Sequence, residues 1–437
     1  MTTIAQNELL TRTGPGTSMG ALFRRYWIPV MMSSEVAGPD CDPVRVKLLS
    51  EELICFRDTA GTVALLDRYC PHRRVSLWFG RNEGHGLRCS YHGWKFDAEG
   101  QCVDIPSHEG DDALRKDIRI KSYPCIERGG VVWTYMGPPE HRPPPPEFEW
   151  TTVPGSHRYV DRRLGECNYL QALEGGIDSS HVSSLHGGEL RKGGTLDSDP
   201  GTGSRERLSF LNEKKIHFEV TPSASGLQIG ASRRAGDGTN YWRITQWIMP
   251  WYTMIPPRTT DSPLHGHAWV PIDDENCFVW NVTYHPSRPL TETELEEMHN
   301  GEGIYAELIP GSFRTAANKD NDYLMDREAQ REGRYYSGIK GIAMQDASVQ
   351  ESMGPIVDRS LERLTTTDIA IVQTRRRLME AARRAERGEE LPALDPSTYR
   401  VRSATLFLPE GVRLADAEAT LQEATRTESP YGERSFA

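Results

Sequence analysis

Two short runs of cysteine and histidine constrain this chain more than any other feature of its sequence. Cys70 and His72 stand together in YCPH, and Cys89 and His92 stand together in CSYHGW, with residues 73–88 between the pairs. Thiolates and neutral imidazoles are strong metal ligands. Two such pairs on short reversals of the chain can therefore hold one metal centre between them.

The order of these residues indicates the kind of centre. A zinc ribbon or finger normally pairs C-x-x-C with C-x-x-C or with H-x-x-x-H. One Cys and one His in each loop instead suits a 2Fe-2S cluster, with two Cys on one iron and two His on the other. A zinc site or four unrelated residues are the alternatives. The cluster is favoured because nearby glycines permit turns that bring backbone amides toward the sulfurs, namely Gly80, Gly84, Gly86 and Gly93.

With these residues the sequence resembles the Rieske non-haem iron oxygenases, and among them the large (alpha) subunits of the phthalate dioxygenase-like group. The segments that carry the resemblance include YCPHRRVSLWFGRNEGHGLRCSYHGWK and LEGGIDSSHVSSLH. The resemblance implies an α+β fold of two parts. An N-terminal all-β Rieske 2Fe-2S domain precedes a catalytic domain, in which helices wrap an antiparallel sheet in a helix-grip, START-like arrangement.

Length and charge limit the class of protein. The 437 residues, 37% of them hydrophobic, can bury a sizeable core and suit two domains. With 51 basic and 62 acidic residues the net charge is −11, and no basic run favours a nucleic acid or an anionic membrane as partner. No apolar run reaches the roughly 18 residues of a membrane span, and the first ten residues lack the apolar core of a signal peptide. We expect a cytoplasmic protein.

The pattern of apolar residues predicts where the domains begin and end. Residues 1–40 form an N-terminal helical segment packed on the Rieske domain, with one helix expected across residues 14–30. Short antiparallel strands follow, and residues 41–142 make up the Rieske domain. The Pro-rich run just after it is stiff and marks the boundary. The catalytic domain is expected at 143–410, and residues 411–437, which are charged and poor in core residues, are expected to be a loose tail.

Alternating segments in the second part predict a single antiparallel sheet. They are residues 158–165, 214–220, 226–232, 239–248, 264–271 and 277–284. A long helix is predicted over residues 367–387, because Thr and Asp stand at its start, apolar residues recur at helical spacing, and Gly388 follows its basic end.

A second metal site is indicated by Asp178, His181 and His186. Asp178 and His181 have the spacing of one helix face, whereas five residues between the histidines would splay their rings apart on a regular helix. We therefore expect the helix to bend or end between them, as Gly175-Gly176 and Gly187-Gly188 permit. Taken alone, the two histidines could be surface residues. Together with Asn168 and Glu174, the pattern resembles the mononuclear-iron signature of the family.

Two His and one carboxylate would occupy one face of Fe(II), so a third ligand is required. The candidates are Asp346 and Asp358. The family places its Asp just after Glu or Gln and shortly before a second Glu, which favours Asp346 in Gln345-Asp346 with Glu351. Asp358 lies beside Arg359 and could belong to a surface ion pair.

The resemblance also implies how electrons reach this iron. Family subunits form homotrimers, single or stacked, in which a Rieske histidine of one chain faces the iron of the next. Asp178 is the residue that would join the two imidazoles, since a carboxylate can accept an N–H from each.

The resemblance implies that the substrate is an aromatic carboxylate. Matching by position gives Arg207, Arg243 and Ser179 as its binding residues, because a guanidinium binds a carboxylate through two parallel hydrogen bonds. Exposed, salt-bridged arginines are the alternative reading of the first two. Phthalate, isophthalate, a substituted benzoate and an aryl ether with one carboxylate all remain open.

The implied function is that of the terminal oxygenase component of a multicomponent dioxygenase, forming a cis-dihydrodiol from the ring, O2 and electrons. The chain lacks a G-x-G-x-x-G in a βαβ setting and a second, four-Cys cluster motif, so a separate reductase with flavin and a ferredoxin-type 2Fe-2S cluster would oxidise NADH. One alternative is a Rieske monooxygenase that dealkylates or cleaves an ether on an aromatic acid. Another is a Rieske electron-transfer protein whose second domain only binds a ligand, against which His181 and His186 weigh.

Overall fold

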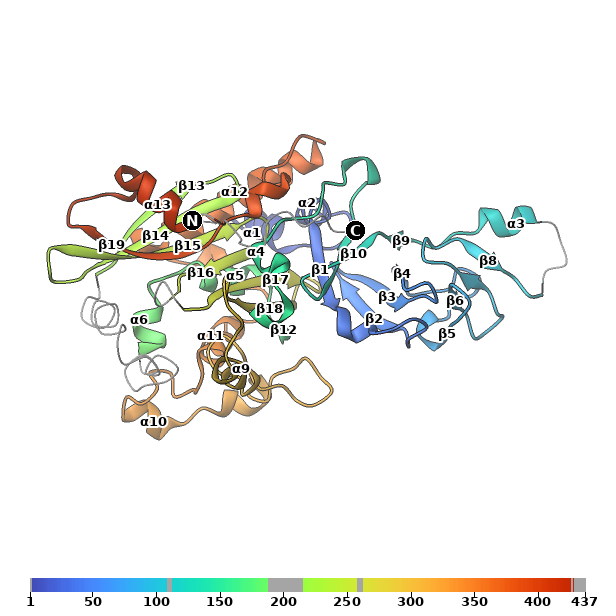
Figure 1. The fold of residues 1–437 in the computed structure, drawn as a ribbon, viewed down its shortest axis with the longest axis horizontal. Helices are drawn as coiled ribbons and strands as arrows, with labels where there is room; N and C mark the ends of the chain where they lie inside the picture. The colour runs from blue at the N-terminus through green and yellow to red at the C-terminus, as the bar shows by residue number, and fades with distance from the viewer. Residues whose placement is uncertain (1, 108–111, 188–214, 258–261, 426, 428–437) are drawn as a thin grey trace. The chain divides into compact units, whose positions relative to one another are not determined.

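The structure is a computed structural model that describes residues 2–107, 112–187, 215–257, 262–425 and 427. The chain forms two compact units (Figure 1). One is Thr13–Pro145, and the other combines Met1–Arg12 with Pro146–Ala437. The expected N-terminal segment 1–40 is thus divided between the two units, and the boundary lies slightly after the predicted one at 142/143. No helix among the described residues is both long and apolar enough to cross a membrane.

The unit Thr13–Pro145 is built from three small antiparallel sheets, with strand orders β1-β11-β10, β2-β3-β4-β9 and β5-β6-β7-β8. Its helices are α2 (Ser18–Phe23) and α3 (Asp112–Asp117). Its strands are β1 (Trp27–Met32), β2 (Val44–Leu48), β3 (Glu51–Arg57), β4 (Val63–Asp67), β5 (Arg81–Asn82), β6 (Leu87–Arg88), β7 (Lys95–Phe96), β8 (Cys102–Asp104), β9 (Ser122–Tyr123), β10 (Cys125–Arg128) and β11 (Val131–Tyr135). The predicted all-β character of this unit is confirmed.

The helix predicted over residues 14–30 was wrong in its second half. Only α2 is helical, with Thr17 capping it by accepting a hydrogen bond from the Gly20 amide. The chain then enters β1, which pairs with β11 and shifts register between Pro29 and Met31. Pairing with another strand outweighs the helical spacing of the apolar residues, and the register shift accommodates the proline that lacks an N–H.

The larger unit has one antiparallel sheet, as predicted, although its described residues form eight strands where six segments were expected. Their order is β12-β18-β17-β16-β15-β14-β13, with β19 paired to β15 (Figure 1). The strands are β12 (Arg158–Gly165), β13 (His217–Pro222), β14 (Gly226–Arg234), β15 (Thr239–Ile248), β16 (Tyr252–Ile255), β17 (Leu264–Pro271), β18 (Cys277–Tyr284) and β19 (Ala404–Pro409). The helices are α1 (Ile4–Thr11), α4 (Glu149–Thr152), α5 (Tyr169–Gly176), α6 (Val182–Leu185), α9 (Glu292–His299), α10 (Arg327–Arg331), α11 (Ile342–Glu351), α12 (Ile369–Glu386) and α13 (Glu418–Thr425).

The long helix predicted near the C-terminus is present as α12, but the loose tail predicted from residue 411 is not loose at its start. Leu414 and Leu421 are buried, and they pack with Trp242 and Ile244 of β15. These two leucines therefore attach residues 414–425 to the sheet in spite of the charged composition.

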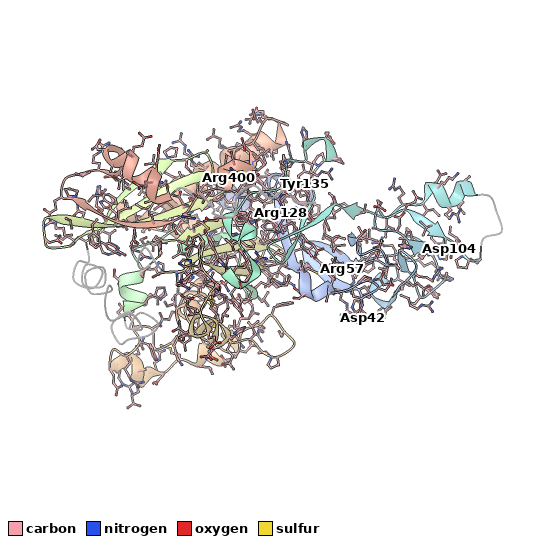
Figure 2. All side chains as sticks on the ribbon, viewed as in Figure 1. Asp42, Arg57, Asp104, Arg128, Tyr135 and Arg400 are labelled. Carbon is pink, nitrogen blue, oxygen red and sulfur yellow. The ribbon has the colours of Figure 1, made fainter. Side chains whose placement is uncertain are left out.

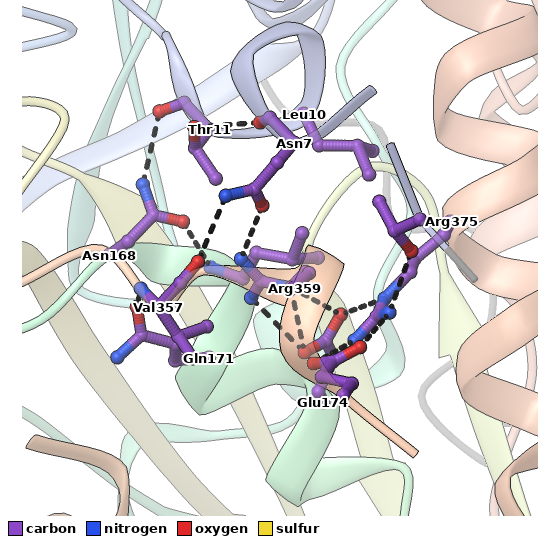
Figure 3. A network of polar contacts seen from close by, with 12 residues as sticks. Asn7, Leu10, Thr11, Asn168, Gln171, Glu174, Val357, Arg359 and Arg375 are labelled. Atoms are coloured by element: carbon purple, nitrogen blue, oxygen red, sulfur yellow. Dashed lines mark hydrogen bonds and ion pairs between the residues drawn. The ribbon is translucent and has the colours of Figure 1, made fainter. Parts of the chain in front are cut away.

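Helix α5 is held by a network of buried polar groups (Figure 3). Asn168 caps it, accepting from the Leu170 amide while donating to the carbonyls of Thr11 and Asp274 at 3.0 and 2.6 Å. Gln171, one turn further, donates to the carbonyls of Gln350 and Gly354, both at 3.0 Å. These contacts attach α5 both to the N-terminal residues and to the end of α11.

A buried ion cluster completes this network (Figure 3). The Glu174 carboxylate pairs with Arg375 at 2.6 Å and with Arg359 at 3.1 Å, and Arg375 also pairs with Glu362 at 2.6 Å. Burial acts to raise the pKa of Glu174, but the two guanidiniums outweigh it and hold the pKa below its ordinary value. The cluster therefore stabilises the folded state only while Glu174 is ionised.

We predict that Glu174→Gln destabilises the protein by about 3–5 kcal/mol, because it leaves two buried guanidiniums with too little negative charge. Urea unfolding at pH 7 measures this loss. A native pKa below the unfolded value means that the contribution of Glu174 is present above the ordinary glutamate pKa and disappears as the pH falls through the native value. The variant should accordingly lose less stability than the wild type on acidification.

Glu389→Gln is the matched control, because it removes a carboxylate from an exposed pair with Arg387 at the end of α12. Unfolding of that variant should coincide with the wild type. Equal unfolding curves for Glu174→Gln and the wild type would contradict the stabilising role of the cluster.

Candidate metal centres

The two Cys/His loops of the smaller unit have the same backbone turn. The Arg74 amide donates to the Cys70 carbonyl at 2.9 Å, and the Gly93 amide donates to the Cys89 carbonyl at 3.0 Å. Arg74 and Gly93, each four residues after its cysteine, both have left-handed backbone, with φ of 58° and 76°. Glycine adopts this conformation without strain, whereas an arginine does so at a cost. The pairs are therefore presented by two equivalent turns.

Neighbouring side chains brace the second turn. Arg88 donates to the Gly93 carbonyl at 2.6 Å and to Asp104, labelled in Figure 2, at 2.8 Å. A Cβ on Gly93 would stand 2.9 Å from Cγ of Pro106, so the close approach also requires glycine here.

The four expected cluster residues lie close together. Cys70 and Cys89 are buried, at 2% and 3% exposure, and the ring centroids of His72 and His92 are 4.4 Å apart. Trp94 stacks on His72 with centroids 4.6 Å apart. Burial raises the pKa of the Cys70 thiol to about 12, so a thiolate at this position requires a cation. A donor set of two buried sulfurs and two adjacent imidazoles fits an iron–sulfur cluster.

A second donor set lies in the larger unit, between the end of α5 and α11. His181 directly precedes the single turn of α6 and His186 directly follows it. Their ring centroids are 5.1 Å apart. The expectation that Asp178 and His181 share a helix face was wrong, because α5 ends at Gly176. The two adjacent glycines at the end of α5 allow the chain to turn there, and a one-turn helix then sets both rings toward one point.

Asp346 on α11 meets both imidazoles. Its Oδ1 lies 3.5 Å from Nε2 of His181 and 3.2 Å from Nε2 of His186. One donor atom from each of these three residues falls within 4.8 Å of the others. Burial acts to raise the pKa of Asp346, but the charges of His186 and His181 keep it below its ordinary value. Two imidazoles and one carboxylate on one side of a shared point fit a non-haem Fe(II) site.

Asp358, the other candidate, is placed elsewhere. It is exposed and caps a short 3-10 helix, accepting from the amide and hydroxyl of Ser360 at 2.9 and 2.6 Å.

Each histidine has its other ring nitrogen occupied by a side chain. Nδ1 of His186 lies 2.6 Å from Oε1 of Gln345, whose own amide donates to the Ile339 carbonyl at 2.8 Å. The Gln345 oxygen must then accept from the Nδ1–H of His186, and the other ring nitrogen, Nε2, faces Asp346. Sequence reasoning named Gln345 only as a marker of the position of Asp346.

Asp178 plays the corresponding part for His181. Its Oδ2 lies 3.4 Å from Nδ1 of His181, and its Oδ1 accepts from the amide and hydroxyl of Ser180 at 2.7 and 2.5 Å. Burial acts to raise the pKa of Asp178, yet its contact with His181 holds the pKa below the ordinary value. An ionised Asp178 orients the ring so that Nε2 points to Asp346.

The two described residues that were expected to bind the substrate carboxylate, Ser179 and Arg243, make hydrogen bonds to different parts of the chain. Ser179 is buried, and its carbonyl accepts from Arg233 of β14 at 3.1 Å. Arg243, half-buried on β15, donates to the Pro256 carbonyl at 3.2 Å. Arg207 lies outside the described residues. Arg233 also donates to Ser183 at 3.2 Å, so it braces the segment on both sides of His181.

Comparison with known proteins agrees with both centres. Residues 26–124 match the family described as Rieske [2Fe-2S] domain, and residues 134–421 match the one described as LigXa C-terminal domain like. The 3-chlorobenzoate-3,4-dioxygenase oxygenase subunit of Comamonas testosteroni is 38% identical over 401 residues, which is 88% of this chain and 90% of that one. The phthalate 4,5-dioxygenase oxygenase subunit of Pseudomonas putida is 37% identical over 399 residues, covering 89% and 88%.

A crystal structure of dicamba monooxygenase bound to dicamba shares the fold. Its TM-score is 0.55 at 18% identity, with 84% of this chain and 99% of that chain covered. The two family matches together cover most of the chain, and the relatives are matched over most of their own length. The chain therefore belongs to the Rieske non-haem iron oxygenases, as an oxygenase subunit whose cofactors are a Rieske 2Fe-2S cluster and a mononuclear iron.

Proposed function

We propose that this chain is the terminal oxygenase of a multicomponent cytoplasmic dioxygenase that cis-dihydroxylates an aromatic carboxylate. The observation that carries the proposal is the convergence of His181, His186 and Asp346, with Asp178 on the far nitrogen of His181. The relatives named for 3-chlorobenzoate and phthalate support the substrate class. The ring, O2, NADH and one proton give the cis-dihydrodiol and NAD+, with both oxygen atoms entering the ring.

In this proposal Cys70, His72, Cys89 and His92 hold the cluster, and His181, His186 and Asp346 hold the iron. The iron, when bound, is the site of O2 activation and the cluster delivers the electrons that a separate NADH-dependent reductase supplies. Three protein ligands leave the remaining positions of the metal open. Gln345 and Asp178 keep the two imidazoles in the orientation that binding requires.

Asp178 is proposed to join the two centres across subunits of a homotrimer. It is ionised, and its Oδ1 accepts from Ser180 on the side away from His181. A carboxylate has further lone pairs, so the same residue can accept from a cluster-bound imidazole of a neighbouring chain. Ser179, Arg207 and Arg243 are proposed to hold the ring carboxylate.

Reductase-coupled turnover over a panel of benzene mono- and dicarboxylates tests the function. We expect cis-dihydrodiols from at least one of phthalate, isophthalate and 3-chlorobenzoate, with both oxygen atoms derived from 18O2. A dealkylated phenol with one labelled oxygen, formed from an alkoxybenzoate, would instead assign the enzyme to the monooxygenases. Absence of oxygenation across the panel, with the cluster reduced and the iron present, would reject the substrate class.

Asp346→Ala should abolish oxygenation and lower the mononuclear iron content, while the visible spectrum of the cluster stays unchanged because the two sites share no ligand. Metal analysis together with absorption spectroscopy measures both. Asp358→Ala is the control, since that residue only caps an exposed turn. Full iron content in Asp346→Ala, combined with its loss in Asp358→Ala, would move the ligand to Asp358.

Asp178→Asn should leave both metal sites loaded, since neither loses a ligand. It should slow reoxidation of the reduced cluster by orders of magnitude, and each tenfold corresponds to about 1.4 kcal/mol of activation free energy. Single turnover with substrate and O2 follows this step. Mixed trimers with Cys70→Ala chains test the route: an intact cluster in one chain then meets an intact Asp178 in the next, and activity returns. A wild-type rate of cluster reoxidation in Asp178→Asn, or no recovered activity in mixed trimers, would contradict electron transfer between subunits through Asp178.

A further inference from the structure

Arg163 of β12 is a buried arginine whose Nε has no hydrogen-bond acceptor in the described parts of the chain. It is 6% exposed, and its Nε is fully enclosed without a hydrogen-bond acceptor. Within the described parts of the chain, no ion pair or hydrogen bond to its guanidinium occurs. An enclosed arginine normally finds a carboxylate or several carbonyls, because an unpaired charge in the interior is strongly destabilising. The side chain is therefore arranged for a partner that the protein itself does not supply.

The nearest carboxylate on its strand is engaged elsewhere. Asp161, two residues earlier on the same face, accepts from the Asn281 amide at 2.8 Å. The oxygen of Asn281 in turn lies 2.9 Å from Nδ1 of His267. This chain of three polar residues crosses β12, β18 and β17 in register. Asp161 is thereby held toward Asn281, and it acts on Arg163 through its charge without a hydrogen bond between the two side chains.

Arg163 stands in the row next to these three polar residues, on the same face of the sheet. In register it faces Val279 of β18, which faces Trp269 of β17. The Trp269 ring lies directly beneath α5, where a Cβ on Gly176 would come within 2.0 Å of it. The row of an arginine, an aliphatic side chain and an indole thus ends under the helix that leads to the iron ligands.

Electrostatics link the neighbouring row of Asp161, Asn281 and His267 to Asp346. Burial lowers the pKa of His267 to about 4, the charge of Arg163 lowers it further, and the charge of Asp346 acts in the opposite direction. His267 therefore lies within the electrostatic reach of both the arginine and the proposed iron ligand.

We propose that Arg163 binds the carboxylate of the aromatic substrate. This inference rests on the proposed function and names a recognition residue that the resemblance did not indicate. A planar guanidinium offers two parallel N–H donors to a carboxylate, and the absence of a competing protein acceptor keeps them available. Arg243, by contrast, already donates to the Pro256 carbonyl.

Anaerobic calorimetry on the loaded enzyme tests this with a matched pair of ligands, 3-chlorobenzoate and the neutral 3-chlorobenzamide. Arg163→Met should weaken binding of the carboxylate about 10- to 100-fold, the range for a hydrogen-bonded charge, and alter binding of the amide less than about threefold. Arg163→Lys should fall between, since it keeps the charge and loses the paired donors.

Arg162→Met is the matched control, because Arg162 is equally buried on the opposite face of β12. Its guanidinium lies 4.3 Å from the ring centroids of Phe278 and Phe313. This variant should retain the preference for the carboxylate. Thermal unfolding without ligand separates recognition from packing: Arg163→Met should melt no lower than the wild type, since it removes an unpaired buried charge, whereas Arg162→Met should melt lower.

The outcomes distinguish this inference from the proposed function. Unchanged carboxylate preference in Arg163→Met overturns the role of Arg163 alone, and loss of that preference in Arg243→Met would move the contact to β15. A marked loss of thermal stability in Arg163→Met, with ligand preference intact, also overturns it. A wild-type enzyme that binds neither 3-chlorobenzoate nor phthalate would overturn the proposed function itself.

Discussion

The fold of the catalytic unit depends on how the buried carboxylate of Glu174 is compensated. Its partners Arg359 and Arg375 lie 185 and 201 residues later in the chain, so neutralising one charge brings distant segments against α5. Gln171, on the same helix, joins α5 to the end of α11. Helices α5 and α11 are thus fixed relative to each other by hydrogen bonds, which are directional. Apolar contacts alone would allow the two helices to slide past each other.

Hydrogen bonds to neighbouring side chains also set the orientation of the donor imidazoles. His181 and His186 each have Nδ1 held by an oxygen, a carboxylate in one and an amide in the other. Both therefore direct Nε2 toward Asp346. The two supports differ in charge, and a carboxylate makes its imidazole the more basic and electron-donating of the pair. The pocket is consequently asymmetric even though its two nitrogen donors are of one kind.

Much of this architecture could be predicted from local patterns. The strand at 158–165 and the long helix α12 were found where periodicity placed them, whereas β16 and β19 were missed because their short apolar segments carry little periodic signal. The helix at 14–30 failed because pairing with β11 is a long-range effect. Asp346 could be preferred to Asp358 by resemblance. The missing hydrogen-bond acceptor at Nε of Arg163 has no sequence signal, because it depends on which side chains of β12, β18 and β17 lie near it.

The assignment of Met1–Arg12 to the catalytic unit makes the cluster-bearing residues Thr13–Pro145 an insertion within that unit. The chain therefore passes between the two units twice, at residues 12/13 and at residues 145/146. Exchanging cluster units between relatives would need both junctions to be kept, and an amino-terminal truncation that removes α1 would leave only the second. Residues 1–12 supply no metal donor. They nevertheless determine whether the cluster-bearing unit is connected to the catalytic unit by one chain junction or by two.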